Sequence, residues 1–253
     1  MRPVLALREA LEAQLEAIRT HGPKVYVNAD PEEVHQLRVA IRRSRALLRA
    51  ARPLITDERA EPLRSELGDL GRELGPARDA DVFAAYLRAE AESMDGDAAA
   101  LATLVARVDE ERQAGYARAR AALDAPRHVL LLEKLADFVS GVEIAEGSLD
   151  DVVDVELDRF RKAAKDVESD EGLHAARIRA KRVRYAAEAA GRKKLVDRMK
   201  RLQDAAGEHQ DAAVAEERLR SLAEPQTALV AGRLIERQQR RRLSARKAWS
   251  KLA

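Results

Sequence analysis

The stretch HQLRVAIRRSRALLR, from His35 to Arg49, decides the fold class, because its basic and apolar residues separate onto different sides only when they are placed on a helix. At about 100° per residue, the basic positions three, seven and ten residues after His35 fall within roughly 80° of it on one helix flank. The apolar band beside them consists of Val34, Leu37, Ile41, Ser44 and Leu48. No acidic residue occurs between Val34 and Thr56. The stretch therefore predicts a helix that packs into a bundle and carries uncompensated arginines along its edge.

The same basic pattern occurs a second time, 139 residues later, as HAARIRAKRVRY from His174 to Tyr185. We call the first copy the first stripe, made of His35, Arg38, Arg42, Arg43, Arg45 and Arg49. The second stripe consists of His174, Arg177, Lys181, Arg182 and Arg184. Like charges on adjacent helical turns repel by ~0.2–0.5 kcal/mol per pair. A solvated basic face is the alternative, but repetition of this repulsion favours a polyanion as the ligand.

A further duplicated segment follows each stripe. LGRELGPARDADV from Leu70 to Val82 aligns with LQDAAGEHQDAAV from Leu202 to Val214, at an offset of 132. Leucine, glycine, aspartate and valine occupy the same relative positions in both copies. We therefore expect one domain over 1–253 with two internal repeats, 1–140 and 141–253, related by a pseudo-twofold axis.

Helical periodicity extends over nearly the whole sequence and predicts an all-α fold. The predicted helices span 3–20, 32–52, 57–74, 80–94, 97–124, 127–140, 148–166, 171–190, 193–206, 212–223 and 226–252. Asp30 precedes a proline and should cap the second helix. Gly75 and Gly207 are expected to end helices, with Asp79 and Asp211 capping the next ones. The one candidate strand, KVYVN at 24–28, is bracketed too tightly by prolines.

The composition sets limits on function. The 46 basic and 44 acidic residues give a net charge of +2, but the basic residues are concentrated at 35–52, 174–184 and 233–251. A local positive field is therefore compatible with a small net charge. The chain has no cysteine, which excludes disulfides and thiolate metal sites. The sequence shows no membrane span and no secretory leader, so we expect a cytoplasmic protein without a cofactor.

The histidines and aspartates leave chemical alternatives open. A metal site needs three or four converging ligands, and neither His35 nor His174 has another histidine one turn away. No nucleophile or carboxylate partner for catalysis is evident, so we interpret both histidines as donors to phosphate or as residues that orient the neighbouring arginines. A structural histidine at a helix start or between helices is the alternative. Asp79, Asp81 and Asp211 are alternative metal ligands for phosphoryl chemistry. His21 and His128 are expected in loops or on the surface, and His209 in a structural role.

Together, the stripes and the duplicated segments resemble the CHAD family, the conserved histidine α-helical domain, over roughly residues 5–250. The resemblance implies two similar helical bundles facing a basic groove or pore. It also implies non-catalytic binding of inorganic polyphosphate by both stripes. Members are often fused to a triphosphate-tunnel enzyme domain, whose Glu-x-Glu-x-Lys signature is missing here, so we expect a stand-alone protein associated with polyphosphate granules. Glu188 in place of Arg49, and Gln210 in place of Arg78, imply that the two halves bind unequally.

Three other functions compete with this interpretation. Binding of RNA or single-stranded DNA would use the same basic surface, but aromatic residues make up only 3% of the chain, which leaves few for base stacking. A metal-dependent phosphatase or phosphotransferase would use the histidines and aspartates. A helical adaptor would bind an acidic protein. The basic segment 233–251 is either a solvated tail or part of the site.

Overall fold

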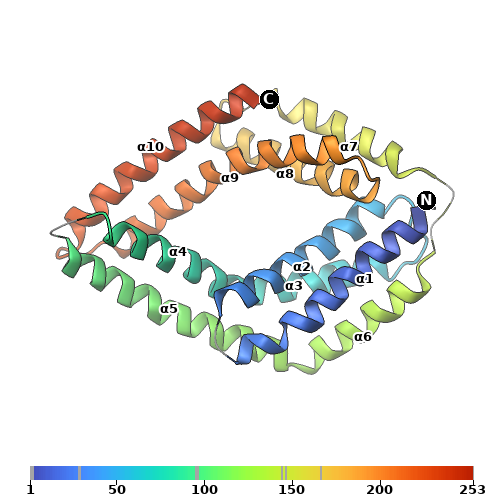
Figure 1. Cartoon of the computed structure of the whole chain (residues 1–253), viewed down its shortest axis with the longest axis horizontal. Helices are drawn as coiled ribbons and strands as arrows, with labels where there is room; N and C mark the ends of the chain where they lie inside the picture. The colour runs from blue at the N-terminus through green and yellow to red at the C-terminus, as the bar shows by residue number, and fades with distance from the viewer. Residues whose placement is uncertain are drawn as a thin grey trace. The chain divides into compact units, whose positions relative to one another are not determined.

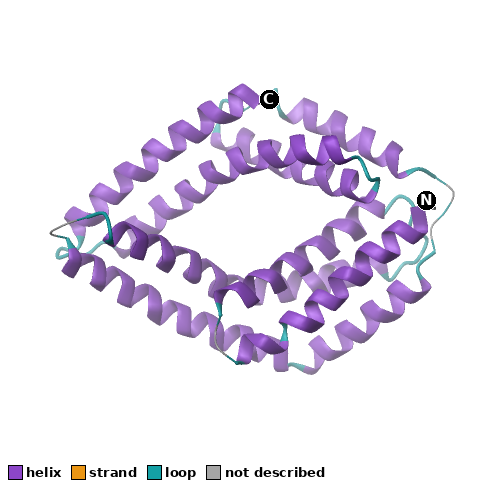
Figure 2. Ribbon diagram, in the orientation of Figure 1, coloured by secondary structure: helices purple, strands orange, loops and turns teal. Residues whose placement is uncertain are grey.

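The computed structural model describes residues 3–27, 30–94, 97–143, 145, 147–165 and 167–252. Helices dominate this part of the chain, and it contains no strand (Figure 2). The helices shown in Figure 1 are α1 (Pro3–His21), α2 (Pro31–Ala51), α3 (Ala60–Glu73), α4 (Gly75–Ala91), α5 (Ala98–Asp124), α6 (Pro126–Gly141), α7 (Leu149–Ala163), α8 (Asp170–Ala189), α9 (Lys193–Leu222) and α10 (Ala228–Leu252). The all-α prediction is confirmed. Residues 24–26 of the candidate strand belong to a 3₁₀ helix, η1 (Pro23–Tyr26), because Pro23 favours a helical start, and Asn28 lies outside the described residues.

Local chemistry explains where several helices begin and end. Asp30 has an extended backbone, and its Oδ1 accepts a hydrogen bond of 2.9 Å from the backbone N–H of Glu32. Pro31 then occupies the first helical position of α2, where no hydrogen-bond donor is required. Gly191 follows α8 with a φ of 71°, a backbone conformation that favours glycine. These residues set the start of α2 and the end of α8, the two helices that carry the stripes.

The predicted break at Gly207 is wrong. Helix α9 continues through Gly207 and Asp211, so Asp211 caps no helix. Asp79 also lies inside a helix, because α4 already begins at Gly75 and only Leu74 separates it from α3. Glycine is tolerated inside a helix. Stripe arginines lie beside Gly75 and Gly207, as described below.

The chain forms two compact units, and several helices contribute to both. Unit 1 contains residues 1–81, 111–155 and 185–193, and unit 2 contains residues 82–110, 156–184 and 194–253. Helices α4, α5, α7, α8 and α9 each have residues in both units. Each unit therefore combines segments of both sequence repeats, although the first stripe lies wholly in unit 1 and the second wholly in unit 2.

In unit 1, α2 packs against α1 and α3, and α6 packs against α1 and α3 (Figure 1). The apolar band of α2 is buried in this core, including Leu37, Ile41 and Leu48. Burial of this band fixes the rotation of α2 about its axis. The adjacent flank, which bears Arg38, Arg42, Arg45 and Arg49, is thereby placed along the edge of the core.

The core of unit 2 is built differently around α8. Ala176 and Ala180 are fully buried and pack with Val183, Met199 and Trp249. Because alanine is small, neighbouring helices can approach α8 closely. This explains why the second stripe carries alanines where the first carries Leu37 and Ile41. In neither unit do the described helices include one long and apolar enough to cross a membrane.

Candidate anion-binding site

The first stripe lies along α2, with its cations at different depths. Arg42, Arg43 and Arg49 are exposed, whereas His35, Arg38 and Arg45 are half-buried. None of the five arginines forms an ion pair with a carboxylate in the described part of unit 1. The half-buried arginines are instead positioned by α3 and the start of α4.

Glycines on α3 and α4 provide the space for these arginines. Arg38 donates from Nη1 to the carbonyl oxygen of Gly71 at 2.8 Å. The same Nη1 atom lies 3.2 Å from the point where a Cβ on Gly75 would be. The guanidinium of Arg45 lies equally close to Gly68, at 3.1–3.2 Å from its Cβ point. These glycines hold the half-buried guanidinium groups against the helix surface.

Three arginines surround His35. Burial lowers the pKa of the His35 imidazole, and the charges of Arg78, Arg42 and Arg38 lower it further, while Glu32 acts in the opposite direction. A neutral imidazole can donate a hydrogen bond to an oxyanion from one ring nitrogen. We call His35, Arg38, Arg42 and Arg78 the histidine cluster. Arg78 was not among the predicted site residues, although it stands three residues after Gly75 in the duplicated segment.

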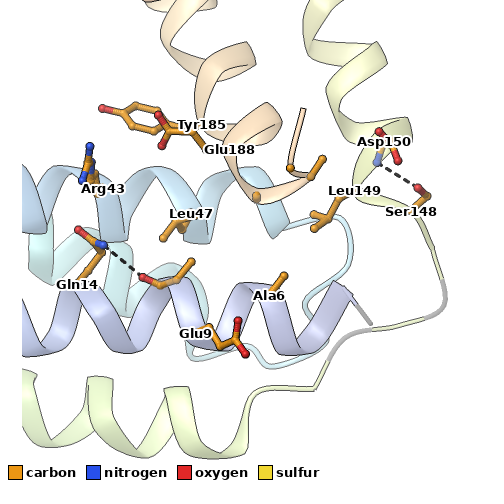
Figure 3. A pocket seen from close by; sticks show the side chains of 14 residues that line it. Ala6, Glu9, Gln14, Arg43, Leu47, Ser148, Leu149, Asp150, Tyr185 and Glu188 are labelled. Carbon is orange, nitrogen blue, oxygen red and sulfur yellow. Dashed lines mark hydrogen bonds between the residues drawn. The ribbon is translucent and has the colours of Figure 1, made fainter. Parts of the chain in front are cut away.

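Arg43 is placed apart from the histidine cluster. It lines a pocket of about 740 Å³ in unit 1, and Figure 3 shows it projecting from α2 toward Tyr185 and Glu188 of α8. Glu9 of α1 and Asp150 of α7 line the same pocket. Arg43 lies eight residues after His35, which places it about 80° around the helix axis from His35. Arg38 and Arg42 lie on the other side of His35, so Arg43 points in a different direction from them.

The second stripe repeats the arrangement in unit 2 with different neighbours. His174 is exposed, and its Nδ1 lies 3.1 Å from Oε1 of Gln210, the residue that replaces Arg78. Arg177 lies over Gly207, with Nη2 at 3.8 Å from the Cβ point of that glycine. Arg182 and Arg184 are half-buried on the same helix. The sequence duplication is therefore accompanied by a repeated pairing of a stripe arginine with a glycine.

An aspartate accompanies the leading cation of each stripe. The charge of Asp79 raises the pKa of Arg38, against the larger lowering caused by burial. Near Asp211, desolvation by the surrounding protein raises the carboxyl pKa, although part of the side chain is exposed, and the charges of Arg177 and Lys181 oppose that rise. Both aspartates thus balance cations of their stripe.

Asp81 has a structural role. It is buried in unit 1, where its two carboxylate oxygens accept hydrogen bonds from Arg112 Nε at 2.6 Å and from the Tyr116 hydroxyl at 2.9 Å. Among the described residues, no three histidine, cysteine, aspartate or glutamate side chains form a group that could hold a metal ion. The carboxylates proposed for phosphoryl chemistry are therefore engaged with cations and a hydroxyl.

The remaining histidines lie at structural positions. His128 was expected in a loop or on the surface, but it is buried in α6, and this burial lowers its pKa. His21 is half-buried at the end of α1, with Nδ1 2.5 Å from the Glu33 carboxylate. His209 is buried in unit 2, with Nε2 3.3 Å from Asp170. None of these three histidines belongs to a stripe.

The family model described as the CHAD domain matches residues 9–220. This chain belongs to the CHAD domain family. Two Mycobacterium tuberculosis proteins, the uncharacterized protein MT2285 of strain CDC 1551 / Oshkosh and the uncharacterized protein Rv2226 of strain ATCC 25618 / H37Rv, are each 32% identical to it over 233 residues. The alignments cover 86% of this chain and 45% of each relative, so the CHAD chain spans less than half their length.

Two solved structures share the CHAD fold. The CHAD domain from the plant Ricinus communis has a TM-score of 0.79 and 25% identity, with 98% of this chain and 90% of that chain covered. PptA from Streptomyces chartreusis has a TM-score of 0.81 and 21% identity, with 98% of both chains covered. The predicted family and fold are therefore confirmed by sequence and by structure.

Proposed function

We propose that this CHAD protein binds inorganic polyphosphate through its two stripes and performs no reaction on it. The observation that carries the proposal is the first stripe itself, in which five arginines on one helix form no ion pair with a carboxylate within the described part of unit 1, although the charge of Asp79 acts on Arg38. The repulsion between arginines on adjacent turns of this helix is relieved when an anion binds. The repeated stripe on α8 extends the same chemistry to unit 2.

Arginine suits a phosphate ligand because its planar, permanently charged guanidinium presents paired N–H donors to phosphate oxygens. The glycines at 68, 71 and 75 hold the half-buried guanidinium groups of Arg38 and Arg45 in place. A positioned cation loses less rotational freedom on binding than a flexible one. Several cations on one helix also favour a long polyanion, which engages many of them at once.

The aromatic residues argue against a nucleic acid as the preferred ligand. Six of the eight are buried, namely Phe83, Tyr116, Phe138, Phe160, Tyr185 and Trp249. Of the other two, Tyr86 is half-buried and its hydroxyl accepts a hydrogen bond from Gln238 at 2.7 Å, while Tyr26 directs its hydroxyl to Asp124 at 2.8 Å. Base stacking on aromatic rings is the usual source of affinity for single strands. A ligand made only of phosphates needs the cations alone.

The non-catalytic part of the proposal is supported by the environment of the two stripe histidines. Nδ1 of His174 lies 3.1 Å from the amide oxygen of Gln210, and the charges of three arginines and of Glu32 act on His35. Within the described residues of its unit, neither histidine is hydrogen-bonded to a carboxylate, the group that orients the histidine of a catalytic triad. Location in the cytoplasm, on polyphosphate granules, completes the proposal.

A competition titration tests the proposal. Fluorescent long-chain polyphosphate is displaced at physiological salt by pyrophosphate, short polyphosphate, single-stranded DNA and RNA. We expect displacement to strengthen with polyphosphate length and nucleic acids to compete weakly. Equal competition by nucleic acid, or no binding of the tracer, would contradict the proposal. Release of phosphate in the presence of Mg²⁺ or Mn²⁺ would contradict its non-catalytic part.

A charge-reversal variant locates the site. Arg42→Glu combined with Lys181→Glu should abolish binding with nearly unchanged helicity and melting temperature. The matched control is Lys247→Glu with Lys251→Glu, which makes the same charge change at two exposed lysines of α10 without ion pairs in the described part of unit 2. If both double variants lose affinity equally, binding follows net charge and not the stripes. Arg42→Glu alone covers the case in which the first double variant fails to fold.

A further inference from the structure

The end of the first stripe meets two arginines that no stripe contains. On α3, Arg64, Gly68 and Arg72 are spaced four residues apart, so they lie on one face of the helix. The guanidinium of Arg45 lies at Gly68, between the two arginines, with its Cζ 3.1 Å from the Cβ point. Three guanidinium groups are therefore gathered on one face of α3 in unit 1.

The charges around Arg45 are not balanced. Burial is the largest cause of the lowered pKa of Arg45, followed by the charges of Arg64 and Arg72. Asp69 raises this pKa, and Arg49 lowers it further. The carboxylates here are already engaged, because Arg64 donates from Nε to Glu61 at 2.9 Å and Arg72 pairs with Asp69. Four arginines thus face two carboxylates, and the Nε of Arg45 is buried without a hydrogen-bond partner.

The second repeat does not preserve this arrangement. At the offset of the duplicated segments, the positions of Arg64, Gly68 and Arg72 correspond to Val196, Lys200 and Asp204. Arg49 corresponds to Glu188 at the offset of the stripes. Unit 1 therefore keeps a glycine in a helix interior, where it is unfavourable, to admit a guanidinium between two others. An anion is the partner that makes such an arrangement favourable.

We propose that Arg45, Arg49, Arg64 and Arg72, here called the α3 cluster, form a second phosphate subsite that belongs to unit 1 alone. The inference rests on the proposed function. Arg38 and Arg45 are seven residues apart on α2, so the α3 cluster lies roughly 10 Å along the helix from the histidine cluster. A short phosphate chain is held by one cluster, whereas a long chain engages both. The α3 cluster is thus a determinant of selectivity for chain length.

The test compares two variants that lose the same charge. Arg64→Gln with Arg72→Gln removes two arginines that each pair with a carboxylate three residues earlier. The control, Arg159→Gln with Arg161→Gln, removes two exposed arginines of α7 in unit 2 with the same pairing to Glu156 and Asp158. Affinities of the full chain are measured for sodium tripolyphosphate and for long-chain polyphosphate, over a range of salt concentrations.

We expect Arg64→Gln/Arg72→Gln to weaken long-chain binding by about tenfold, because two charge-assisted contacts are lost. The slope of log affinity against log salt should fall by about 1–2. Tripolyphosphate affinity should change by less than about twofold, since the histidine cluster is intact, and the control should match wild type with both ligands. Arg64→Lys/Arg72→Lys should restore most of the long-chain affinity.

Three outcomes would overturn the inference, and they are distinguishable. If wild type binds long-chain polyphosphate and both glutamine variants bind it as tightly as wild type does, the α3 cluster is not a subsite while the proposed function stands. If wild type binds neither phosphate probe, the proposed function fails and the subsite fails with it. If Arg64→Gln/Arg72→Gln loses affinity for both probes equally, Arg64 and Arg72 act only through the general positive potential of the surface, and the proposed selectivity for chain length is wrong.

Discussion

Helices α2 and α10 are both rich in arginine, yet their charges are used differently. Within unit 2, six arginines of α10 pair with carboxylates, namely Arg233 with Asp97, Arg237 with Glu90, Arg240 with Glu236, Arg241 with Glu208, Arg242 with Asp170 and Glu216, and Arg246 with Asp170. The five arginines of α2 have no such pair in the described part of unit 1. The comparison shows that the availability of cations, and not their density, identifies the candidate site.

The largest expected contrast between the two helices is in stability. Arg242 donates to Glu216 at 3.0 Å and also pairs with Asp170, so it joins α8, α9 and α10 in unit 2. Arg242→Ala removes one of the three hydrogen-bond partners of the nearly buried Glu216 carboxylate, together with the pair to Asp170, and should lower the free energy of unfolding by about 1–3 kcal/mol. Polyphosphate affinity of the folded variant should be unchanged. Urea unfolding and fluorescence titration measure the two quantities.

Two controls sharpen this prediction. Arg240→Ala removes only an exposed pair with Glu236 and should change stability by less than about 1 kcal/mol. Arg42→Ala should do the reverse of Arg242→Ala, with weaker polyphosphate binding and an unchanged unfolding curve. The comparison breaks if Arg242→Ala weakens binding while stability is preserved, since α10 would then belong to the site.

A smaller contrast should appear in the pH dependence of stability. Hydrogen bonds from Arg220, Gln239 and Arg242 lower the pKa of Glu216 to about 2. A carboxyl with a lowered folded-state pKa contributes stability above its unfolded pKa of about 4.3 and loses it as the pH falls toward 2. Glu216→Gln should therefore destabilise the protein by about 1–2 kcal/mol at pH 7.

The measurement is urea unfolding of wild type and Glu216→Gln between pH values of about 2 and 7. The difference between the two proteins should be constant at neutral pH and shrink below the unfolded pKa of glutamate. A difference that stays constant through the acid range would show that Glu216 contributes through packing and not through its charge.

The smallest expected effect concerns the unequal stripes. Arg78 belongs to the histidine cluster of unit 1, and Gln210 takes its place beside His174 in unit 2. Arg78→Gln should weaken polyphosphate binding by roughly threefold to tenfold, and Gln210→Arg should strengthen it by a similar factor. Equilibrium titrations at two salt concentrations check both variants. No change in either one would show that positions 78 and 210 do not contact the ligand.

Much of the fold follows from the sequence because the apolar periodicity and the capping residues are local signals. The prediction of α5 at 97–124 differs from the structure by one residue, and Asp30 caps α2 as expected. The glycines were misjudged for a physical reason. Glycine commonly ends a helix, but Gly207 lies inside α9, and the guanidinium of Arg177, thirty residues earlier in the sequence, lies beside it with Nη2 3.8 Å from the point where a Cβ would be.

The candidate site was only partly predictable for the same reason. The stripes are visible because their residues share one helix, and their role in binding stays a prediction. Arg64 and Arg72 join Arg45 only through the packing of α3 on α2, which no short-range pattern encodes. The pairing of α10 depends on contacts across more than a hundred residues, as between Arg233 and Asp97. Whether its charges were free could not be judged from its own sequence.

The interleaving of the two units has a consequence for biosynthesis. Unit 1 contains residues 185–193, and unit 2 contains residues 82–110, so neither unit is a continuous piece of chain. A ribosome must translate past residue 193 before unit 1 has all its parts, and to the end of α10 before unit 2 does. Contacts between distant segments form late and slowly. The nascent chain therefore completes neither unit before residue 193 is made, and no stop codon placed between the repeats would release a finished half.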